Sequence, residues 1–193
     1  YDPIKGFAGI SNLIESPLVA VVPQPFAANN LKEFVAYAQA HPGDVNFGSA
    51  GTGNTLHLAA EQLSRVAKIK MNHVQYKGAS QAVLDLLAGR IQLMVDLPQT
   101  PLQHIQAGKL KALAVTSKER LAQLPQVPTT AEAGYPDFSF TTRVGLAAPA
   151  GTPDAVRKKL RDELARAAQD PEVRAALDKQ AMVAAISASP QEY

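Results

Sequence analysis

A glycine-rich stretch with hydroxyl and amide side chains is the part of this sequence best suited to chemistry. Residues 48–57 read GSAGTGNTLH and stand between a short apolar run, 45–47, and an amphipathic segment, 58–63. That order predicts a strand, a glycine turn and a helix. The start of a helix carries unpaired N–H groups and a partial positive charge, and glycines let a ligand approach the backbone closely. The stretch therefore predicts a small anion site, to which the hydroxyls of Ser49, Thr52 and Thr55 add donors.

A tight turn that caps a helix without binding anything has the same pattern, so both interpretations stay open. The commoner motifs do not fit. A Walker A loop needs Gly-Lys-Ser/Thr where this chain has Asn54-Thr55, and a hydrolase nucleophile elbow needs a glycine where it has Phe47. A dinucleotide fingerprint needs an acidic residue at the end of a second strand, and none follows at the right distance.

The bulk composition limits the class of protein. The 193 residues suffice for one large domain or two small lobes, and 46% hydrophobic with 19% charged residues predicts a packed core. The net charge of +2 comes from scattered basic residues and aromatic side chains are few, so we expect no nucleic-acid surface. No apolar run approaches ~18 residues and there is no cysteine, so we expect no membrane span, disulfide or thiolate metal site.

Strand-like and helix-like segments alternate along the chain, which predicts an α/β fold with a parallel-rich sheet covered on both faces. The expected strands are 9–14, 18–22, 45–47, 70–76, 91–95, 111–116, 138–148 and 182–186. The expected helices are 31–39, 56–67, 81–88, 98–107, 129–133, 153–168 and 171–179, and 189–192 carries a further helix-start pattern.

Three candidate segments follow the carboxyl ends of expected strands: the Ser49 loop, the loop at Tyr76-Lys77-Gly78, and Asp96. Open α/β sheets bind ligands beyond these ends, and three segments on one rim support a site better than one does. Lys77 either attracts an anion or is a solvated lysine. Asp96 either accepts from an ammonium or hydroxyl group of a ligand or caps the following helix.

The four histidines give no metal-ligand pattern. His57, on the first turn of an expected helix, either contacts a ligand or bonds to backbone, while His73 lies in a strand and is expected to be structural. His41 and His104 have no partner spacing, so we expect no metal ion and no cofactor.

Short motifs spread along the chain resemble, in their order, those of one family. They are Tyr1-Asp2-Pro3, Gly51-Thr52-Gly53 with His57-Leu58, His73-Val74 with Tyr76-Lys77-Gly78, Gly108-Lys109-Leu110, Leu113-Ala114-Val115-Thr116-Ser117, Pro128-Thr129 with Glu132-Ala133-Gly134, and Pro149-Ala150-Gly151-Thr152-Pro153. The sequence is similar, nearly end to end, to the substrate-binding receptors of tripartite tricarboxylate transporters, the Bug or TctC-type family.

The resemblance implies a two-lobed periplasmic binding protein-like (type II) fold that holds one small carboxylate between its lobes, largely with backbone amides and ordered water. It implies a periplasmic receptor without enzymatic activity, which delivers its ligand to membrane transporter subunits. Carried over by position, the ligand-binding residues are Ser49, Gly51, Thr52, Gly53, Asn54, Thr55, His57, Tyr76, Lys77, Gly78, Ala79, Asp96 and Leu97.

The family also has a signal peptide and two further βα units before a segment like Tyr1-Asp2-Pro3, so the resemblance implies an incomplete first lobe. We expect residues 1–22 to be a first-lobe remnant and crossover, 23–112 the second lobe with the carboxylate-binding loops, and 113–193 the rest of the first lobe. Uncovered strand edges and apolar surface then predict a homodimer, exchanged elements or marginal stability. Arg143, where the family usually carries tryptophan, either adds a cation to the cleft or is exposed.

Two other functions would use the same loop. A serine-type hydrolase would use Ser49, His57 and Asp96 as nucleophile, base and acid, which requires hydrogen bonds between them. A phosphate- or nucleotide-binding domain would use the loop amides. Ester hydrolysis, and titration of carboxylates against nucleotides, distinguish these functions from that of a receptor.

Overall fold

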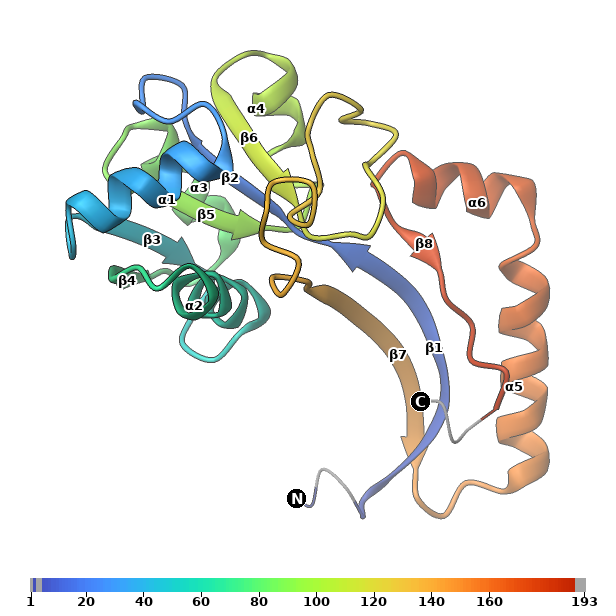
Figure 1. Ribbon diagram of the computed structural model, residues 1–193. Helices are drawn as coiled ribbons and strands as arrows, with labels where there is room; N and C mark the ends of the chain where they lie inside the picture. Colours follow the sequence, from blue (N-terminus) through green and yellow to red (C-terminus); the bar gives the residue numbers. More distant parts are fainter. Residues whose placement is uncertain (1, 3–4, 190–193) are drawn as a thin grey trace. The chain divides into compact units, whose positions relative to one another are not determined.

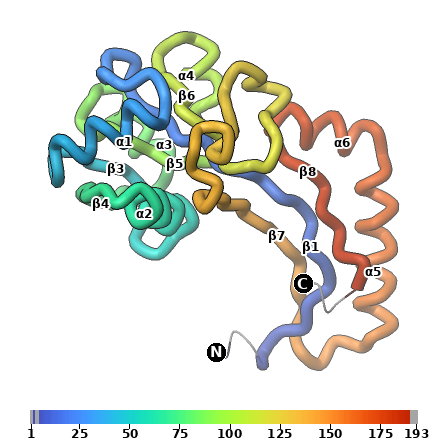
Figure 2. Tube along the Cα trace, viewed as in Figure 1, coloured from blue at the N-terminus to red at the C-terminus, as the bar shows by residue number. Residues whose placement is uncertain are grey.

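The computed structural model describes residues 2 and 5–189, which belong to two compact units (Figure 1). The larger unit is the continuous stretch 17–141, and the smaller combines 1–16 with 142–193. Figure 2 shows this division: in the smaller unit, strand β1 (Phe7–Pro17), in blue, lies beside strand β8 (Val183–Ala184), in red. The larger unit extends past the expected 23–112 at both ends. Its extra segments include β2 and residues 116–140, which pair and pack with its sheet.

The larger unit is built on a five-stranded sheet with the order β4-β3-β5-β2-β6. Its strands are β2 (Val19–Pro23), β3 (Val45–Ser49), β4 (Met71–Gln75), β5 (Leu93–Asp96) and β6 (Leu110–Val115). Strand β3 runs parallel to β4 and β5, whereas β2 runs antiparallel to β5 and β6. Four strands therefore share one direction, as expected of a parallel-rich sheet, and β2 is reversed. Since β2 is apolar and buried on both faces, its pattern did not distinguish the two directions.

Two hydrophobic cores, one on each face of this sheet, hold the larger unit together. Helices α1 (Leu31–Ala40) and α2 (Thr55–Ala67) contribute to the first core, and α3 (Ala79–Leu87) and α4 (Leu102–Gln106) to the second (Figure 1). Alternate residues of one strand face opposite sides. Accordingly, Ala20 and Val22 lie in the first core and Val19 and Val21 in the second.

Side-chain caps fix the starts of the first two helices, as the sequence indicates. The Asn30 side chain accepts a hydrogen bond from the Glu33 amide, and the Glu33 carboxylate accepts one in return from the Asn29 amide. The Asn54 side chain caps α2 in the same way by accepting from the His57 amide. Helix α3 differs, since Gly78 precedes it and provides no side-chain cap.

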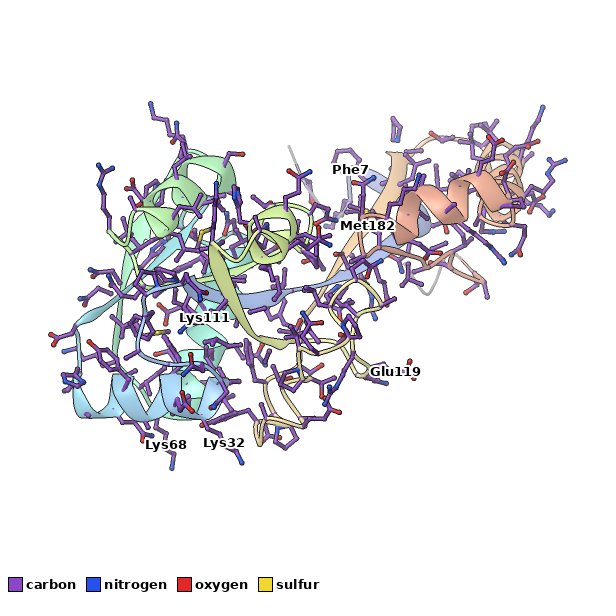
Figure 3. The ribbon with its side chains drawn as sticks, turned by 90° about the horizontal axis from the view of Figure 1, so that it is seen from above. Phe7, Lys32, Lys68, Lys111, Glu119 and Met182 are labelled. Atoms are coloured by element: carbon purple, nitrogen blue, oxygen red, sulfur yellow. The ribbon has the colours of Figure 1, made fainter. Side chains whose placement is uncertain are left out.

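The smaller unit has little buried apolar surface of its own. Its sheet has the order β7-β1-β8, with β1 (Phe7–Pro17), β7 (Thr141–Pro149) and β8 (Val183–Ala184), and its helices are α5 (Asp154–Ala167) and α6 (Pro171–Asp178). Neither helix contains a buried residue. Most of the exposed large apolar side chains of the described chain belong to this unit: Phe7, Val144, Val156, Leu160, Val173 and Val183. Phe7 is labelled in Figure 3, together with two exposed lysines of the larger unit, Lys32 and Lys68.

Several expected elements are shorter in the structure. The expected helix 98–107 is reduced to α4, because a turn closed by the Thr100 amide and the Leu97 carbonyl precedes it. Residues 129–133 form turns, with Thr129 bridged to Val115, and the strand expected over 138–148 begins only at residue 141. The last expected strand, 182–186, is reduced to β8. The helix-start pattern at 189–192 lies outside the described residues except for Ser189.

Within the described part of the chain, no helix combines the length and apolar character that crossing a membrane requires.

The contact between β3 and α3 predicts that Gly48 tolerates no side chain. A Cβ at this position would lie 2.5 Å from Ile91 Cδ1 and 3.2 Å from Ala82 Cβ. The Ile91 methyl group can rotate away but the Ala82 methyl group cannot. We expect Gly48→Ala to lower the free energy of unfolding by about 1–3 kcal/mol through overpacking, measured by denaturant titration.

Gly151→Ala is the matched control, because a Cβ there has no neighbour within 4 Å. We expect its effect to stay within about 0.5 kcal/mol. Equal stability of the two variants would contradict the packing argument.

Candidate functional site: the carboxyl-end rim of β3, β4 and β5

Strand register places the three candidate segments side by side. Ser49 of β3 pairs with Gln75 of β4, so the next residues, Ala50 and Tyr76, are neighbours. Gly48 pairs with Met94 of β5, and counting two residues on places Asp96 at the level of Ala50. The rim expected from the sequence is therefore present, and all of it belongs to the larger unit.

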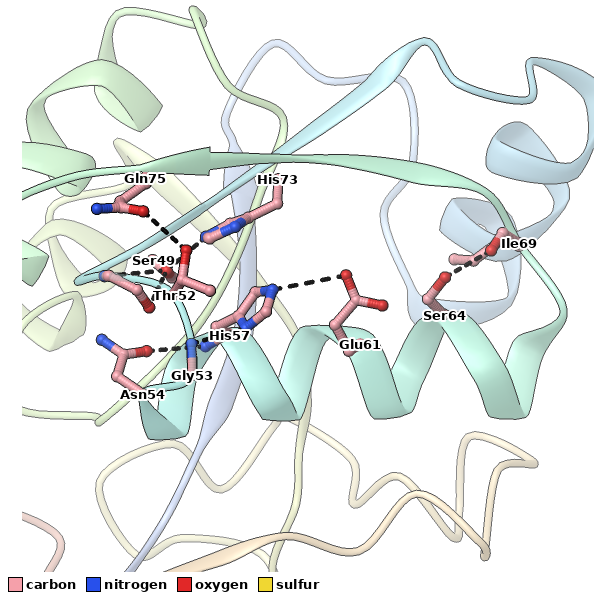
Figure 4. Close-up of polar contacts among 11 residues, drawn as sticks. Ser49, Thr52, Gly53, Asn54, His57, Glu61, Ser64, Ile69, His73 and Gln75 are labelled. Carbon is pink, nitrogen blue, oxygen red and sulfur yellow. Dashed lines mark hydrogen bonds and ion pairs between the residues drawn. The ribbon is translucent and has the colours of Figure 1, made fainter.

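Several polar groups of the glycine loop form hydrogen bonds within the loop or to the adjoining helix and strand (Figure 4). The Gly51 amide donates to Ser49 Oγ over 3.2 Å, and the Gly53 amide donates to His57 Nδ1 over 3.0 Å. The Thr52 hydroxyl donates to Gln75 Oε1 on the neighbouring strand. Gly51 and Gly53 both have a positive φ, which explains why glycine occupies these turn positions.

The remaining amides of this loop are the donors that a ligand could use. Among the described residues, the amides of Thr52, Thr55 and Leu56 have no hydrogen-bond partner. They surround the start of α2, where the helix dipole favours negative charge. The local structure therefore presents unpaired donors at a helix start, and hydrogen bonds within the loop fix its shape.

Ser49 is completely buried and its hydroxyl is already engaged. Ser49 Oγ lies 2.6 Å from His73 Nε2 and 3.0 Å from the Gly51 carbonyl oxygen. When the hydroxyl donates to that carbonyl, it accepts hydrogen bonds from the Gly51 amide and from His73, in the tautomer that carries its proton on Nε2. The hydroxyl thus holds the turn closed, and Ser49 contributes to a ligand site by shaping the loop.

Three neighbouring rings, those of Phe47, His57 and His73, lie beside this turn. The His73 ring lies 5.0 Å from that of Phe47 and 4.0 Å from that of His57, centroid to centroid. His57 Nε2 is also 3.7 Å from Glu61 Oε1. Burial, and to a lesser extent the neighbouring His57, lowers the pKa of His73, while Glu61 opposes the shift. His73 was expected to be structural from its strand position, but its contact with Ser49 was not visible in the sequence.

The serine-hydrolase hypothesis finds no assembled triad in the described residues. Ser49 bonds to His73, whereas the partners of His57 are the Gly53 amide and Glu61. Asp96 accepts from the Leu97 amide instead of from a histidine. A nucleophile, a base and an acid linked by hydrogen bonds are therefore not formed by these three residues.

The second segment combines a fixed tyrosine with a free helix start. Tyr76 donates through its hydroxyl to Asp85 Oδ2 over 2.8 Å, and Asp85 in turn pairs with Arg90. Burial, followed by this bond to Asp85, raises the pKa of Tyr76 to about 12. Lys77 is exposed and forms no ion pair within the described chain. The amides of Ala79 and Ser80, at the start of α3, also lack partners among the described residues.

The third segment contains a buried acid and a buried amide. Asp96 is 1% exposed, and its Oδ1 accepts from the Leu97 amide over 2.7 Å, while its Oδ2 meets hydrogen-bond geometry with none of the described residues. Burial raises the pKa of Asp96 to about 6, although the Leu97 amide and the Thr100 hydroxyl oppose the shift. Both polar side-chain atoms of Gln99 are also buried without partners. Sequence analysis missed Gln99, because a glutamine in a turn carries no distinctive pattern.

Arg143, for which the sequence left a cation in the cleft or an exposed side chain open, is exposed in the structure. No group of three or more potential metal ligands occurs within the described residues. Arg143 belongs to the smaller unit, where it pairs with Glu15, and its side chain is 64% exposed.

The burial of Asp96 predicts that its contribution to stability depends on pH. Because its pKa is about 6 in the folded protein against an ordinary 3.8, the folded state binds the proton more tightly. The stabilising contribution of Asp96 is therefore complete at low pH and is lost as the pH rises through about 6. A pKa difference of about two between the folded and unfolded protein corresponds to about 3 kcal/mol in the free energy of unfolding.

We expect Asp96→Asn to remove this dependence, since an amide does not titrate. The difference in free energy of unfolding between the protein and the variant should change by on the order of 3 kcal/mol between about pH 4 and about pH 7, measured by denaturant titration. A difference that stays constant across this range would contradict the assignment.

Comparison with known proteins places this geometry in a family. The chain is 39% identical over 178 residues to the UPF0065 protein of the tcbD–tcbE intergenic region of Pseudomonas sp. strain P51, covering 92% of this chain and 53% of that protein. The chain thus spans about half the length of the curated relatives it matches.

Solved structures agree with the fold. A protein of R. palustris solved with adipate has a TM-score of 0.90 at 27% identity, over 100% of this chain and 64% of that one. MatC of Rhodopseudomonas palustris, solved with bound malate, has a TM-score of 0.85 at 31% identity, over 95% and 62% of the two chains. These matches confirm the expected α/β fold of periplasmic binding proteins.

The family model described as "Tripartite tricarboxylate transporter family receptor" matches residues 1–193, the whole of the sequence. This match confirms the resemblance inferred from the ordered motifs. The chain belongs to the TctC family of tripartite tricarboxylate transporter receptors.

Proposed function

We propose that the protein is a periplasmic solute-binding receptor, which captures a small carboxylate and delivers it unchanged to a tripartite tricarboxylate-type transporter in the membrane. The observation that carries the proposal is the presence on one rim of two helix starts, those of α2 and α3, whose first amides have no partner in the part of the chain that the structure describes. Both helix dipoles favour negative charge there, and the exposed Lys77 adds a full positive charge.

The physical task of such a receptor is to desolvate a carboxylate without losing affinity. Removing an ionised carboxylate from water is unfavourable unless several charge-assisted hydrogen bonds replace the lost hydration. The amides of Thr52, Thr55 and Ala79 provide such donors without side-chain ordering. Because these donors belong to backbone fixed by caps and glycine turns, little conformational freedom remains to be lost on binding.

In this proposal the expected site residues divide into three roles. Direct donors to the carboxylate are Thr52, Thr55, Lys77, Gly78 and Ala79. Residues that shape the rim are Ser49, Gly51, Gly53, Asn54, His57 and Tyr76, as their internal hydrogen bonds and turn geometry suggest. Asp96 and Leu97 border the far end of the ligand.

Related proteins support an organic acid as the ligand. Two similar structures were solved with adipate and with malate, which are both small dicarboxylates. Another similar structure, of BugD, is described as a periplasmic binding protein. These ligands and this location belong to the relatives, and we extend them to this chain as part of the proposal.

The proposal is tested by calorimetric titration of the full-length gene product with mono-, di- and tricarboxylates, alongside nucleotides and ester substrates. We expect saturable binding of at least one carboxylate and no turnover. Binding of nucleotides but of no carboxylate would overturn the proposal, as would ester hydrolysis that Ser49→Ala abolishes.

A pair of variants at one position separates the amide from the side chain. Thr52→Pro removes an unpartnered amide and bends the loop, and we expect it to weaken carboxylate binding by about tenfold or more, as loss of a hydrogen bond to a charged group implies. Thr52→Ala keeps the amide and loses only the hydroxyl bond to Gln75, so its affinity should change far less. Equal affinities of the two variants would remove this amide from the site.

A further inference from the structure

Gln75, the last residue of β4, lies on the rim but is absent from the site that the sequence predicts. It pairs with Ser49 of β3, and the chain continues from it through Lys77 to the start of α3. Alternate residues of a strand face the same side, so Gln75 shares its face with His73, whose ring lies beside that of His57 on α2. Gln75 is therefore at the junction of the two helix starts.

The Thr52 hydroxyl orients the side-chain amide of Gln75 (Figure 4). That hydroxyl donates to Gln75 Oε1 over 2.7 Å. Because a hydroxyl has only one proton to donate, the Thr52 side chain has none left for a ligand. The amide nitrogen of Gln75, Nε2, only donates, and it has no partner among the described residues. The donor expected at the Thr52 hydroxyl is thus replaced by one at the end of the neighbouring strand.

This donor is close to an amide already assigned to the carboxylate. Oε1 and Nε2 of Gln75 are attached to one carbon, so Nε2 lies next to the atom that contacts Thr52. The backbone amide of Thr52 also lacks a partner in the described chain. A carboxylate has two oxygens with about four lone-pair sites, so it can accept from both groups at once. The Gln75 side chain is exposed, so a ligand has access to it.

The chemistry of Nε2 limits what it can bind. Since Nε2 has no lone pair that accepts, its partner must be an acceptor, and an ionised carboxylate only accepts. The hydrogen bond from Thr52 to Oε1 polarises the Gln75 amide, which strengthens Nε2 as a donor. An ammonium group of a ligand would instead place donors against a donor. The position therefore favours an anion, in agreement with the two helix starts.

We propose that Gln75 is a further ligand-binding residue of the receptor, and that its Nε2 donates to the carboxylate held at the starts of α2 and α3. The inference rests on the proposed function, which it extends from backbone amides to a side chain. It makes residue 75 a determinant of ligand charge, because an amide there stabilises an anion whereas a carboxylate there repels one.

Two substitutions at this position separate the donor from its charge. Gln75→Glu keeps an oxygen that accepts from the Thr52 hydroxyl but replaces Nε2 by a second carboxylate oxygen, and Gln75→Leu removes the donor without adding charge. The full-length gene product and both variants are titrated calorimetrically with mono-, di- and tricarboxylates. We expect Gln75→Leu to weaken the tightest-binding acid by about tenfold and Gln75→Glu by about thirtyfold or more, since the latter adds repulsion to the lost bond.

The pH dependence separates direct contact from structural support. The introduced carboxyl group takes up a proton as the pH falls towards an ordinary pKa of about 4.3, and it then carries an O–H donor in place of the repelling charge. The affinity of Gln75→Glu relative to the unchanged protein should therefore recover by at least about threefold between about pH 7 and about pH 4.5. The relative affinity of Gln75→Leu should stay constant. Protonation of the acid and of the histidines beside the loop is common to all three proteins and cancels in the ratio.

Gln106→Glu, at an exposed glutamine that ends α4, is the matched control for the added charge. We expect its affinity to stay within about twofold of that of the unchanged protein, because solvent screens an exposed charge away from the site. Denaturant unfolding checks that each variant is folded.

The possible failures are distinguishable. Affinities of both Gln75 variants within about twofold of the unchanged protein, with carboxylates still bound, would overturn the inference and leave the proposed receptor function standing. A loss in Gln75→Glu that does not recover at lower pH would assign Gln75 to support of the loop and would also overturn the inference. Binding of no carboxylate by the unchanged protein would overturn the proposed function itself.

Discussion

A helix cannot pair the N–H groups of its own first turn, and the candidate site of this protein depends on that constraint. Two helices, α2 and α3, begin directly beyond the carboxyl ends of β3 and β4. Parallel pairing of these two strands brings both helix starts to one edge of the sheet. A helix start carries a partial positive charge, so two starts on one edge favour an anion there without many charged residues.

Different contacts hold the two helix starts in place. At α2 the loop is tied by side chains: Asn54 caps the helix, Ser49 closes the turn, and the stacked histidines support Ser49. At α3 the preceding Gly78 provides no cap, and the fixed element is the Tyr76–Asp85–Arg90 chain of contacts below it. Hydrogen bonds within the loop therefore fix the part of the rim at α2, whereas the hydrogen bond from Tyr76 to Asp85 of α3 fixes the other part.

Much of the fold could be predicted from residue patterns, because local signals decide local structure. Helices α1 and α2 lie where the sequence predicted helices, each with an asparagine cap, and the strand–glycine–helix order placed the rim correctly. The reversed direction of β2 could not be predicted, since a strand buried on both faces reads alike in either direction. The contact of Ser49 with His73 and the unpaired amide of Gln99 depend on packing between separate segments, which no spacing along the chain encodes.

The larger unit consists of one unbroken stretch, residues 17–141, and contains the strands, helices and cores on which the rim is built. The chain enters and leaves it once, so it has the topology of an inserted domain. The rim and its supporting cores can therefore be transplanted between relatives as a single cassette, with only two splice points to choose.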